Sequence, residues 1–125
     1  MAETWQQLAQ DNRTAAFEAF DRRRWRTCVS RCYYSVFDLV SHQAELRKVQ
    51  MPTQREGPTH RQLTRIVTEN LGLHNDIAGE LVGVCGKSYE LRILADYYPS
   101  STCSERTARD ALRLVRRCFQ LLEEQ

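Results

Sequence analysis

Apolar residues recur at three- and four-residue steps along most of the chain, and this period is the strongest constraint on its fold. Such spacing places apolar side chains on one face of an α-helix. No segment shows the strict alternation that is typical of a half-buried strand. Five segments carry the helical period: residues 2–21, 28–48, 59–72, 75–99 and 102–125.

Four of these segments are 20 to 25 residues long, which corresponds to helices of roughly 30 Å or somewhat more, and the segment 59–72 is shorter. Amphipathic helices of this length bury their apolar faces against one another. The predicted fold class is therefore all-α, an antiparallel up-and-down four-helix bundle with a short fifth helix. At 125 residues, we expect one domain over residues 1–125.

Short polar motifs mark three predicted helix starts. Thr59 with Gln62 and Thr102 with Glu105 each have the spacing of a capping box, in which two side chains bond backbone N–H groups reciprocally. Asn75 is predicted to cap the helix that lies between them.

Glycines and prolines interrupt or modify the pattern at two places. Residues 49–58 contain two prolines and a glycine without an apolar period, which predicts a loop. Gly79, Gly83 and Gly86 fall on one face of the fourth helix, where each costs roughly 1 kcal/mol relative to alanine. We expect a neighbouring helix to pack closely against this face.

The net charge gives no argument for a nucleic-acid partner, because 18 basic and 16 acidic residues leave a balance of only +2. Sixteen of the basic residues are arginines, which favour carboxylates and phosphates. Enough acidic residues are present to pair with them, so a solvated surface is the simpler interpretation, also for the basic turn at residues 22–26. No apolar run approaches the ~18 residues of a membrane span, and the N-terminus does not resemble a signal peptide. We expect a cytoplasmic protein that does not contact membranes.

Cysteine spacing and chemical motifs disfavour several classes of site. The five cysteines are odd in number and lie within apolar helical patterns, which predicts reduced, buried thiols. Cys28 and Cys32 lack a second ligand pair, so no metal site and no cofactor are predicted. Neither a nucleophile motif nor a phosphate-binding loop occurs. His42, His60 and His74 lie in different segments.

Three motifs, in order along the chain, resemble those of a known family. Tyr33 to Phe37 resembles a Tyr-Tyr-Ala-x-Phe core motif, and His60 with Leu63 resembles a His-x-x-Leu helix start. Arg92 to Tyr97 resembles an Arg-x-x-Ala-Asp-Tyr signature. Together they resemble a HEPN domain from Trp5 to Leu122.

The resemblance implies an all-helical bundle that usually forms a homodimer. Many members are metal-independent endoribonucleases that act as toxins or in phage defence, often encoded beside a small nucleotidyltransferase antitoxin. Their composite site uses an arginine on the fourth helix and a histidine four to six residues later, from both protomers. The base deprotonates the ribose 2′-hydroxyl and the cation stabilises the phosphorane.

The chain departs from this pattern at two positions. Arg92 holds the arginine position, but Ile93 replaces the polar neighbour and Tyr97 stands where active members have histidine. A tyrosine is ordinarily protonated at neutral pH and is a poor general base. The chain therefore resembles the Ala-Asp-Tyr branch that lacks the catalytic histidine, and we predict that Arg92, Asp96 and Tyr97 bind phosphate.

Two further readings of these residues stay open. Arg92 and Asp96 can simply form a local ion pair worth about 0.3 kcal/mol or less. No catalytic residue is assigned, and the candidates are Arg92, Tyr97 and His60. Arg55 and His60 match the arginine–histidine spacing, but a glycine and a proline lie between them, so His60 is more simply a capping or packing residue.

The first hypothesis is a dimeric interaction module in a toxin–antitoxin or defence-type system. It would bind a nucleotidyltransferase partner, RNA or a nucleotide through Arg92 without efficient cleavage. The alternative is a metal-independent endoribonuclease toxin that uses Arg92 and a displaced histidine, His60 or His74. A third possibility is a structural adaptor without nucleic-acid contact. Tyr33, Tyr34 and Phe37 are expected to be core and interface aromatics rather than base-stacking platforms.

Overall fold

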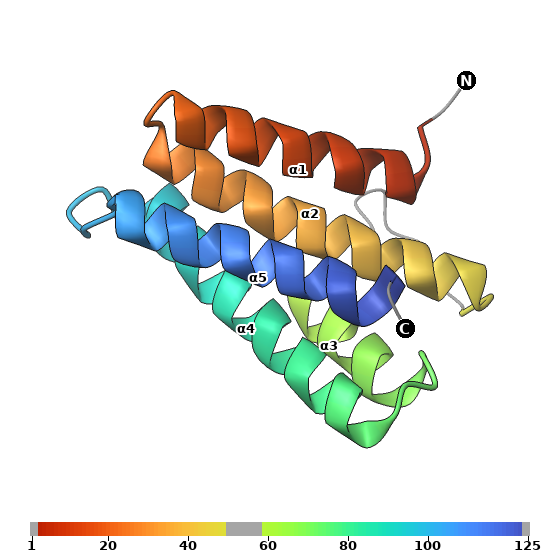
Figure 1. The fold of residues 1–125 in the computed structure, drawn as a ribbon. Coiled ribbons are helices and arrows are strands. Elements are labelled where there is room, and N and C mark those ends of the chain that lie inside the picture. Colours follow the sequence, from red (N-terminus) through yellow and green to blue (C-terminus); the bar gives the residue numbers. More distant parts are fainter. Residues whose placement is uncertain (1–2, 50–58, 124–125) are drawn as a thin grey trace.

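In a computed structural model, which describes residues 3–49 and 59–123, the protein is a bundle of five helices (Figure 1). They are α1 (Trp5–Asp21), α2 (Trp25–Leu46), α3 (His60–Glu69), α4 (Asn75–Tyr97) and α5 (Glu105–Glu123). The four long helices alternate in direction, and the ten-residue α3 lies against α4. These described ranges contain no strand. The predicted all-α bundle with one short helix is confirmed.

The central helix is α2, which packs against all four others. Twelve of its 22 residues are buried, as expected for a helix covered on several sides. In Figure 1, α1 and α5 lie on either side of α2. No helix in the described part of the chain is long and apolar enough to cross a membrane.

The observed helix caps match the sequence prediction at the start of α3 and differ from it at the starts of α4 and α5. Thr59 and Gln62 form the predicted capping box at α3. At α4 the side chain of His74, not Asn75, caps the helix by accepting from the Asp76 backbone N–H. At α5 the reciprocal bonds join Ser104 and Thr107 instead of Thr102 and Glu105. The α5 helix begins only at Glu105, so Thr102 lies too early in the chain to serve as its cap.

Other boundaries shift by a few residues. The second helix starts at Trp25, before the first periodic residue Cys28, and α3 ends at Glu69 rather than near Gly72. Gly72 has a φ of 65°, a left-handed conformation that does not continue a helix. Most of the predicted loop at 49–58 lies outside the described residues.

The expected close packing against Gly79, Gly83 and Gly86 is wrong. Apart from the adjoining part of α4 itself, a Cβ atom built at any of the three meets no described atom within 4 Å. The buried residues of α4, among them Leu81 and Leu91, lie on the opposite side of the helix. The glycine face of α4 is therefore open.

The five cysteines are all free thiols, and four of them are buried. Cys103 alone is half-buried. The predicted role as small buried apolar residues is confirmed for Cys28, Cys32, Cys85 and Cys118.

One buried carboxyl stands out on α2. Asp38 is 5% exposed and accepts a hydrogen bond of 2.8 Å from the Asn12 side chain. Arg31 donates in turn to Asn12 at 3.2 Å. Burial raises the pKa of Asp38 to about 6, although the Asn12 hydrogen bond and the Arg31 charge act to lower it. The folded protein therefore binds a proton here more tightly than the unfolded chain does.

We expect Asp38→Asn to stabilise the protein at pH 7.5 by about 1–3 kcal/mol, since the amide avoids a buried charge and still accepts from Asn12. For the parent protein, the carboxyl makes stability fall as pH rises from about 4 to about 6, the window between the unfolded and folded pKa values. Urea unfolding at several pH values measures both effects. Asp11→Asn, on the exposed surface of α1, is the control. Equal stability of Asp38→Asn and the parent at pH 7.5 would contradict the expectation.

Candidate functional site

Arg92 on α4 is held by three side chains from two helices. Its Nη2 donates to the Tyr34 hydroxyl on α2 at 2.8 Å and to the Tyr97 hydroxyl at 3.2 Å. Its Nε donates to Asp96 Oδ2 at 3.0 Å. The Ser30 hydroxyl donates to the same carboxylate oxygen at 3.2 Å. The guanidinium orientation is therefore fixed by hydrogen bonds from both helices.

Aromatic rings surround this guanidinium. Its Cζ lies 5.2 Å from the ring centroid of Tyr97, 5.3 Å from that of Tyr34 and 5.9 Å from that of Tyr33. Within about 6 Å a cation is attracted by the ring face. The Arg92 side chain is only 16% exposed. We refer to Arg92, Tyr33, Tyr34, Asp96 and Tyr97 as the arginine cluster.

The charge of Arg92 persists despite its burial. Partial burial acts to lower the pKa of the guanidinium, but the Tyr34, Tyr97 and Asp96 groups outweigh it, and the net pKa is raised. Arginine is already cationic throughout the physiological range. The cluster therefore holds a permanent, partly desolvated cation.

The Nη1 end of the Arg92 guanidinium differs from the Nε and Nη2 positions, which bond to described side chains. Among the described residues no side chain or carbonyl accepts from Arg92 Nη1. Nη1 carries two N–H groups, and a charge-assisted bond from a guanidinium to a phosphate oxygen is among the stronger hydrogen bonds in proteins. Asp96, bonded at Nε, repels anions on its own side, so an anion is expected to approach at Nη1.

His60 lies beside this cluster without touching Arg92. Its Nδ1 is 3.4 Å from the Tyr33 hydroxyl, and its ring stacks on Tyr89 with centroids 4.1 Å apart and an interplanar angle of 11°. Burial lowers the pKa of His60, and burial also raises that of Tyr33. The lowered pKa favours the neutral form of the imidazole, and its ring packs against Tyr89 and contacts Tyr33.

Residues 2–125 match the HEPN domain family. The chain belongs to the HEPN family. No curated protein matches the sequence. Membership indicates a nucleotide-binding, RNA-binding or RNase-like module, and HEPN domains often dimerise.

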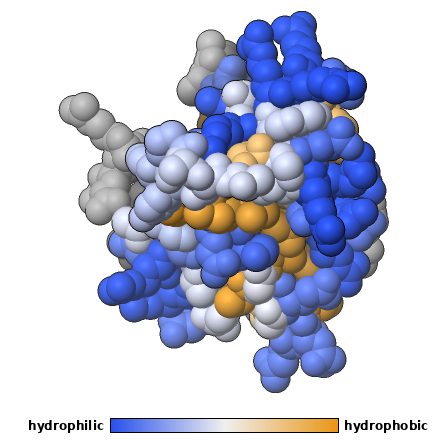
Figure 2. Space-filling model, turned by 90° about the vertical axis from the view of Figure 1, so that its left-hand side faces the viewer, coloured by the Kyte–Doolittle hydropathy of each residue, from blue (hydrophilic) through white to orange (hydrophobic). Residues whose placement is uncertain are grey.

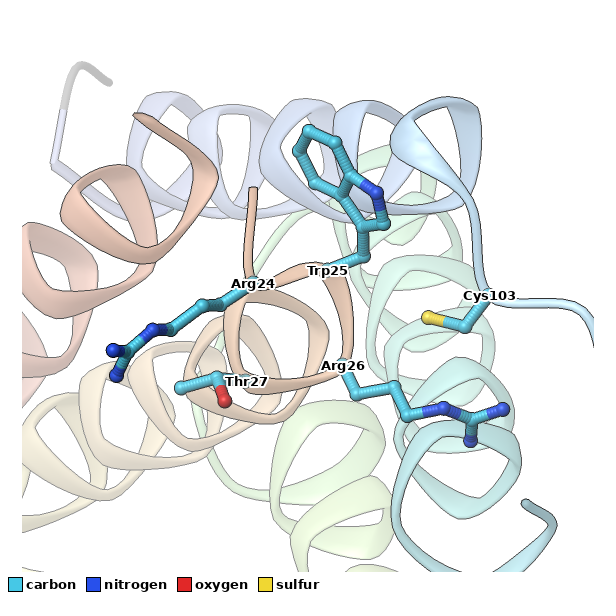
Figure 3. A pocket seen from close by; sticks show the side chains of 5 residues that line it. All are labelled: Arg24, Trp25, Arg26, Thr27 and Cys103. Carbon is cyan, nitrogen blue, oxygen red and sulfur yellow. The ribbon is translucent and has the colours of Figure 1, made fainter. Parts of the chain in front are cut away.

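In the basic turn at residues 22–26 of this HEPN domain, one arginine bonds to the backbone of another helix. A hollow of about 310 Å³ lies at the start of α2 and is lined by Arg24, Trp25, Arg26, Thr27 and Cys103. Figure 3 shows these five side chains. The Arg26 side chain extends toward the end of α4, whereas Arg24 points away from it.

Arg26 donates to five backbone carbonyls at the end of α4 and in the segment after it. The acceptors are Leu94, Ala95, Tyr98, Pro99 and Ser101, at 2.6–3.2 Å. A cation at a helix C-terminus also interacts favourably with the helix dipole. Arg26 is therefore not free for a phosphate, unlike the exposed Arg22, Arg23 and Arg24.

The structure brings together the three residues for which phosphate binding was predicted, and leaves other candidates apart. Arg92, Asp96 and Tyr97 contact one another directly. The predicted Arg92–Asp96 ion pair is confirmed at 3.0 Å. His74 caps the opposite end of α4, and Arg55 lies outside the described residues.

Sequence reasoning missed three contributors to this site. Tyr34 was expected to be a core or interface aromatic, yet its hydroxyl binds Arg92. Ser30 and Tyr89 carried no signal that linked them to Arg92 or His60. Ser30 and Tyr34 are four residues apart, which places them on one face of α2, and this spacing could have indicated a shared site. No cluster of three potential metal ligands occurs within residues 3–49 and 59–123.

Proposed function

We propose that this HEPN domain binds RNA or a nucleotide through a phosphate at Arg92 and does not cleave it efficiently. The observation that carries the proposal is the Nη1 of Arg92, which bonds to no residue that the structure describes, on a cation that is 16% exposed and fixed by Tyr34, Asp96 and Tyr97. A preorganised guanidinium loses little freedom when it binds a phosphate. Tyr97, 60% exposed, offers a ring beside that phosphate.

The groups that contact Arg92 support the proposal of inefficient cleavage. Two are phenols, and the third is the Asp96 carboxylate, which already accepts from Arg92 and Ser30. A general base must lie within hydrogen-bonding reach of the 2′-hydroxyl. No imidazole contacts Arg92 in the described ranges, since His60 is joined to the cluster only through Tyr33.

The alternative is a metal-independent endoribonuclease in which His60 is the base. The observation that favours it is the short path from His60 through the Tyr33 hydroxyl to the rings around Arg92. A neutral imidazole is the form that accepts a proton. This alternative requires the RNA backbone to reach both His60 and Arg92.

Incubation with labelled single-stranded and structured RNA in chelator distinguishes these functions. We expect salt-dependent binding, because phosphate contacts release counterions, and RNA that stays intact for hours. Cleavage that is lost in both His60→Ala and Arg92→Ala would establish the endoribonuclease. Absence of binding at low salt would favour a structural adaptor.

We further propose that the domain forms a homodimer through the open face of α4. This face presents bare backbone at Gly79, Gly83 and Gly86. Leu94 and Tyr97 are 40% and 60% exposed near the end of the same helix. Figure 2, seen from that end of the bundle, shows apolar residues at the surface between hydrophilic ones. Tyr97 lies on the same face of α4 as these glycines, so such a dimer would bring this one member of the arginine cluster to the interface.

Sedimentation over a range of concentrations tests the dimer. We expect Gly83→Arg to shift the protein to a monomer, because the added charged side chain occupies the contact face. Gln10→Arg, exposed on α1, is the control and should leave the dimer intact. A parent protein that is monomeric at every concentration contradicts this proposal.

The cellular setting is also part of the proposal. Five free thiols are typical of a reducing compartment, which supports a cytoplasmic location. We propose a role in a toxin–antitoxin or defence-type system with a nucleotidyltransferase as the partner protein. The gene beside that of this protein tests the assignment, and a nucleotidyltransferase there is the expected finding.

A further inference from the structure

A trough runs between α1 and the first half of α5, on a different part of the molecule from the arginine cluster. It encloses about 410 Å³. Phe17, Phe20 and Leu112 form its apolar floor, and Arg109, Arg113 and Arg116 line its side. Phe17 and Phe20 are half-buried and the three arginines are exposed. We call these six residues the α5 trough.

A second hollow extends this trough toward the start of α5. It encloses about 580 Å³ and shares Arg109 and Arg113 with the first. It also includes Arg106. The arginines at positions 106, 109, 113 and 116 follow one another at steps of three, four and three, so they form a single row along the helix.

The ionic contacts within this row are weak or missing. Arg109 pairs with Glu105 at 2.6 Å and Arg113 with Asp110 at 3.5 Å, and all four side chains are about half exposed or more. Exposed pairs of this kind contribute little and can exchange partners. Arg106 and Arg116 have no ion pair in the described part of the chain.

We infer that the α5 trough docks an amphipathic helix of a partner protein, one that carries carboxylates at one-turn spacing beside an apolar stripe. Successive arginines of the row lie about 4.5–6 Å apart along the axis of α5, the same pitch at which a second helix presents side chains three and four residues apart. Guanidinium groups bind carboxylates in a bidentate manner. The floor of phenylalanine and leucine accepts the apolar stripe.

The charge pattern favours a protein over RNA as the occupant. Asp21 lines the trough, and Glu105 and Asp110 alternate with the arginines. A helix can place a neutral or basic residue opposite each of these carboxylates, whereas a phosphate backbone is negative at every step.

A synthetic helix tests the assignment with the full chain. The probe is a 20-residue fluorescent peptide with leucines on one face and glutamates beside them, and two further peptides replace glutamate by lysine or leucine by serine. We expect the glutamate–leucine peptide to bind at least tenfold more tightly than either of the others, measured by fluorescence anisotropy. Equal binding of the glutamate and lysine peptides would overturn the inference.

Charge reversal provides the matched comparison. We expect the Arg113→Glu/Arg116→Glu variant to lose at least tenfold in affinity for the glutamate peptide and to gain affinity for the lysine peptide. Arg61→Glu/Arg65→Glu, on the exposed side of α3, should change neither. An equal loss of peptide affinity in this control variant contradicts a helical partner. So does a trough variant that loses RNA binding but keeps its affinity for the glutamate peptide. Arg92→Ala should retain peptide binding, so failure here and failure of the proposed phosphate site are distinguishable.

Discussion

Replacement of Arg92 by alanine is expected to weaken RNA binding by about 10- to 100-fold at low salt. The variant loses a charge-assisted hydrogen bond to phosphate, worth about 1.5–3 kcal/mol. The slope of log affinity against log salt concentration should also become shallower by about one, because each neutralised phosphate releases about one counterion. Fluorescence anisotropy with a labelled single-stranded RNA, repeated over a salt series, measures both quantities.

Two variants separate charge from geometry at this position. Arg92→Lys keeps a cation but cannot bond Tyr34, Tyr97 and Asp96 while it donates to an anion, so we expect an intermediate loss. Arg61→Ala removes an exposed arginine on α3 and should have little effect. If Arg61→Ala and Arg92→Ala lose affinity equally, RNA binding depends on overall charge and not on the arginine cluster.

Loss of Arg26 is expected to be the largest single destabilisation outside the apolar core. Arg26→Met keeps much of the side-chain volume but removes the guanidinium donor from five carbonyl groups, of which Leu94 and Tyr98 keep a backbone N–H donor. Removal of one partner from a hydrogen-bonded network that includes a charge costs about 2–4 kcal/mol. A domain of this size should then melt about 10 °C lower.

Thermal unfolding followed by circular dichroism measures this change. Arg24→Met, two residues earlier, is the matched control, because Arg24 is exposed and its side chain makes no capping bond to α2. Equal melting temperatures for the two variants would show that the carbonyl contacts of Arg26 contribute nothing to stability. Since α4 also carries the arginine cluster, Arg26→Met is further expected to weaken RNA binding in proportion to the fraction unfolded.

Local features of the sequence were sufficient to predict the helices. The apolar period at Leu63, Ile66 and Val67 gave α3 its buried side, and Thr59 with Gln62 fixed its start. The Arg92–Asp96 pair was also predictable, because residues four apart meet on a helix whatever surrounds them. These features depend on backbone geometry within one or two turns.

The sequence by itself thus determined the all-helical fold, the family motifs and the contacts of Arg92 within its own helix. Only the tertiary structure placed Tyr34 against Arg92 from 58 positions away and joined Arg26 to Ser101, 75 positions along the chain. It also left the glycine face of α4 open, where the sequence favoured a packed neighbour. The physical reason is that contacts between helices depend on how each helix rotates and slides on the others, and packing of the whole core sets those positions at once.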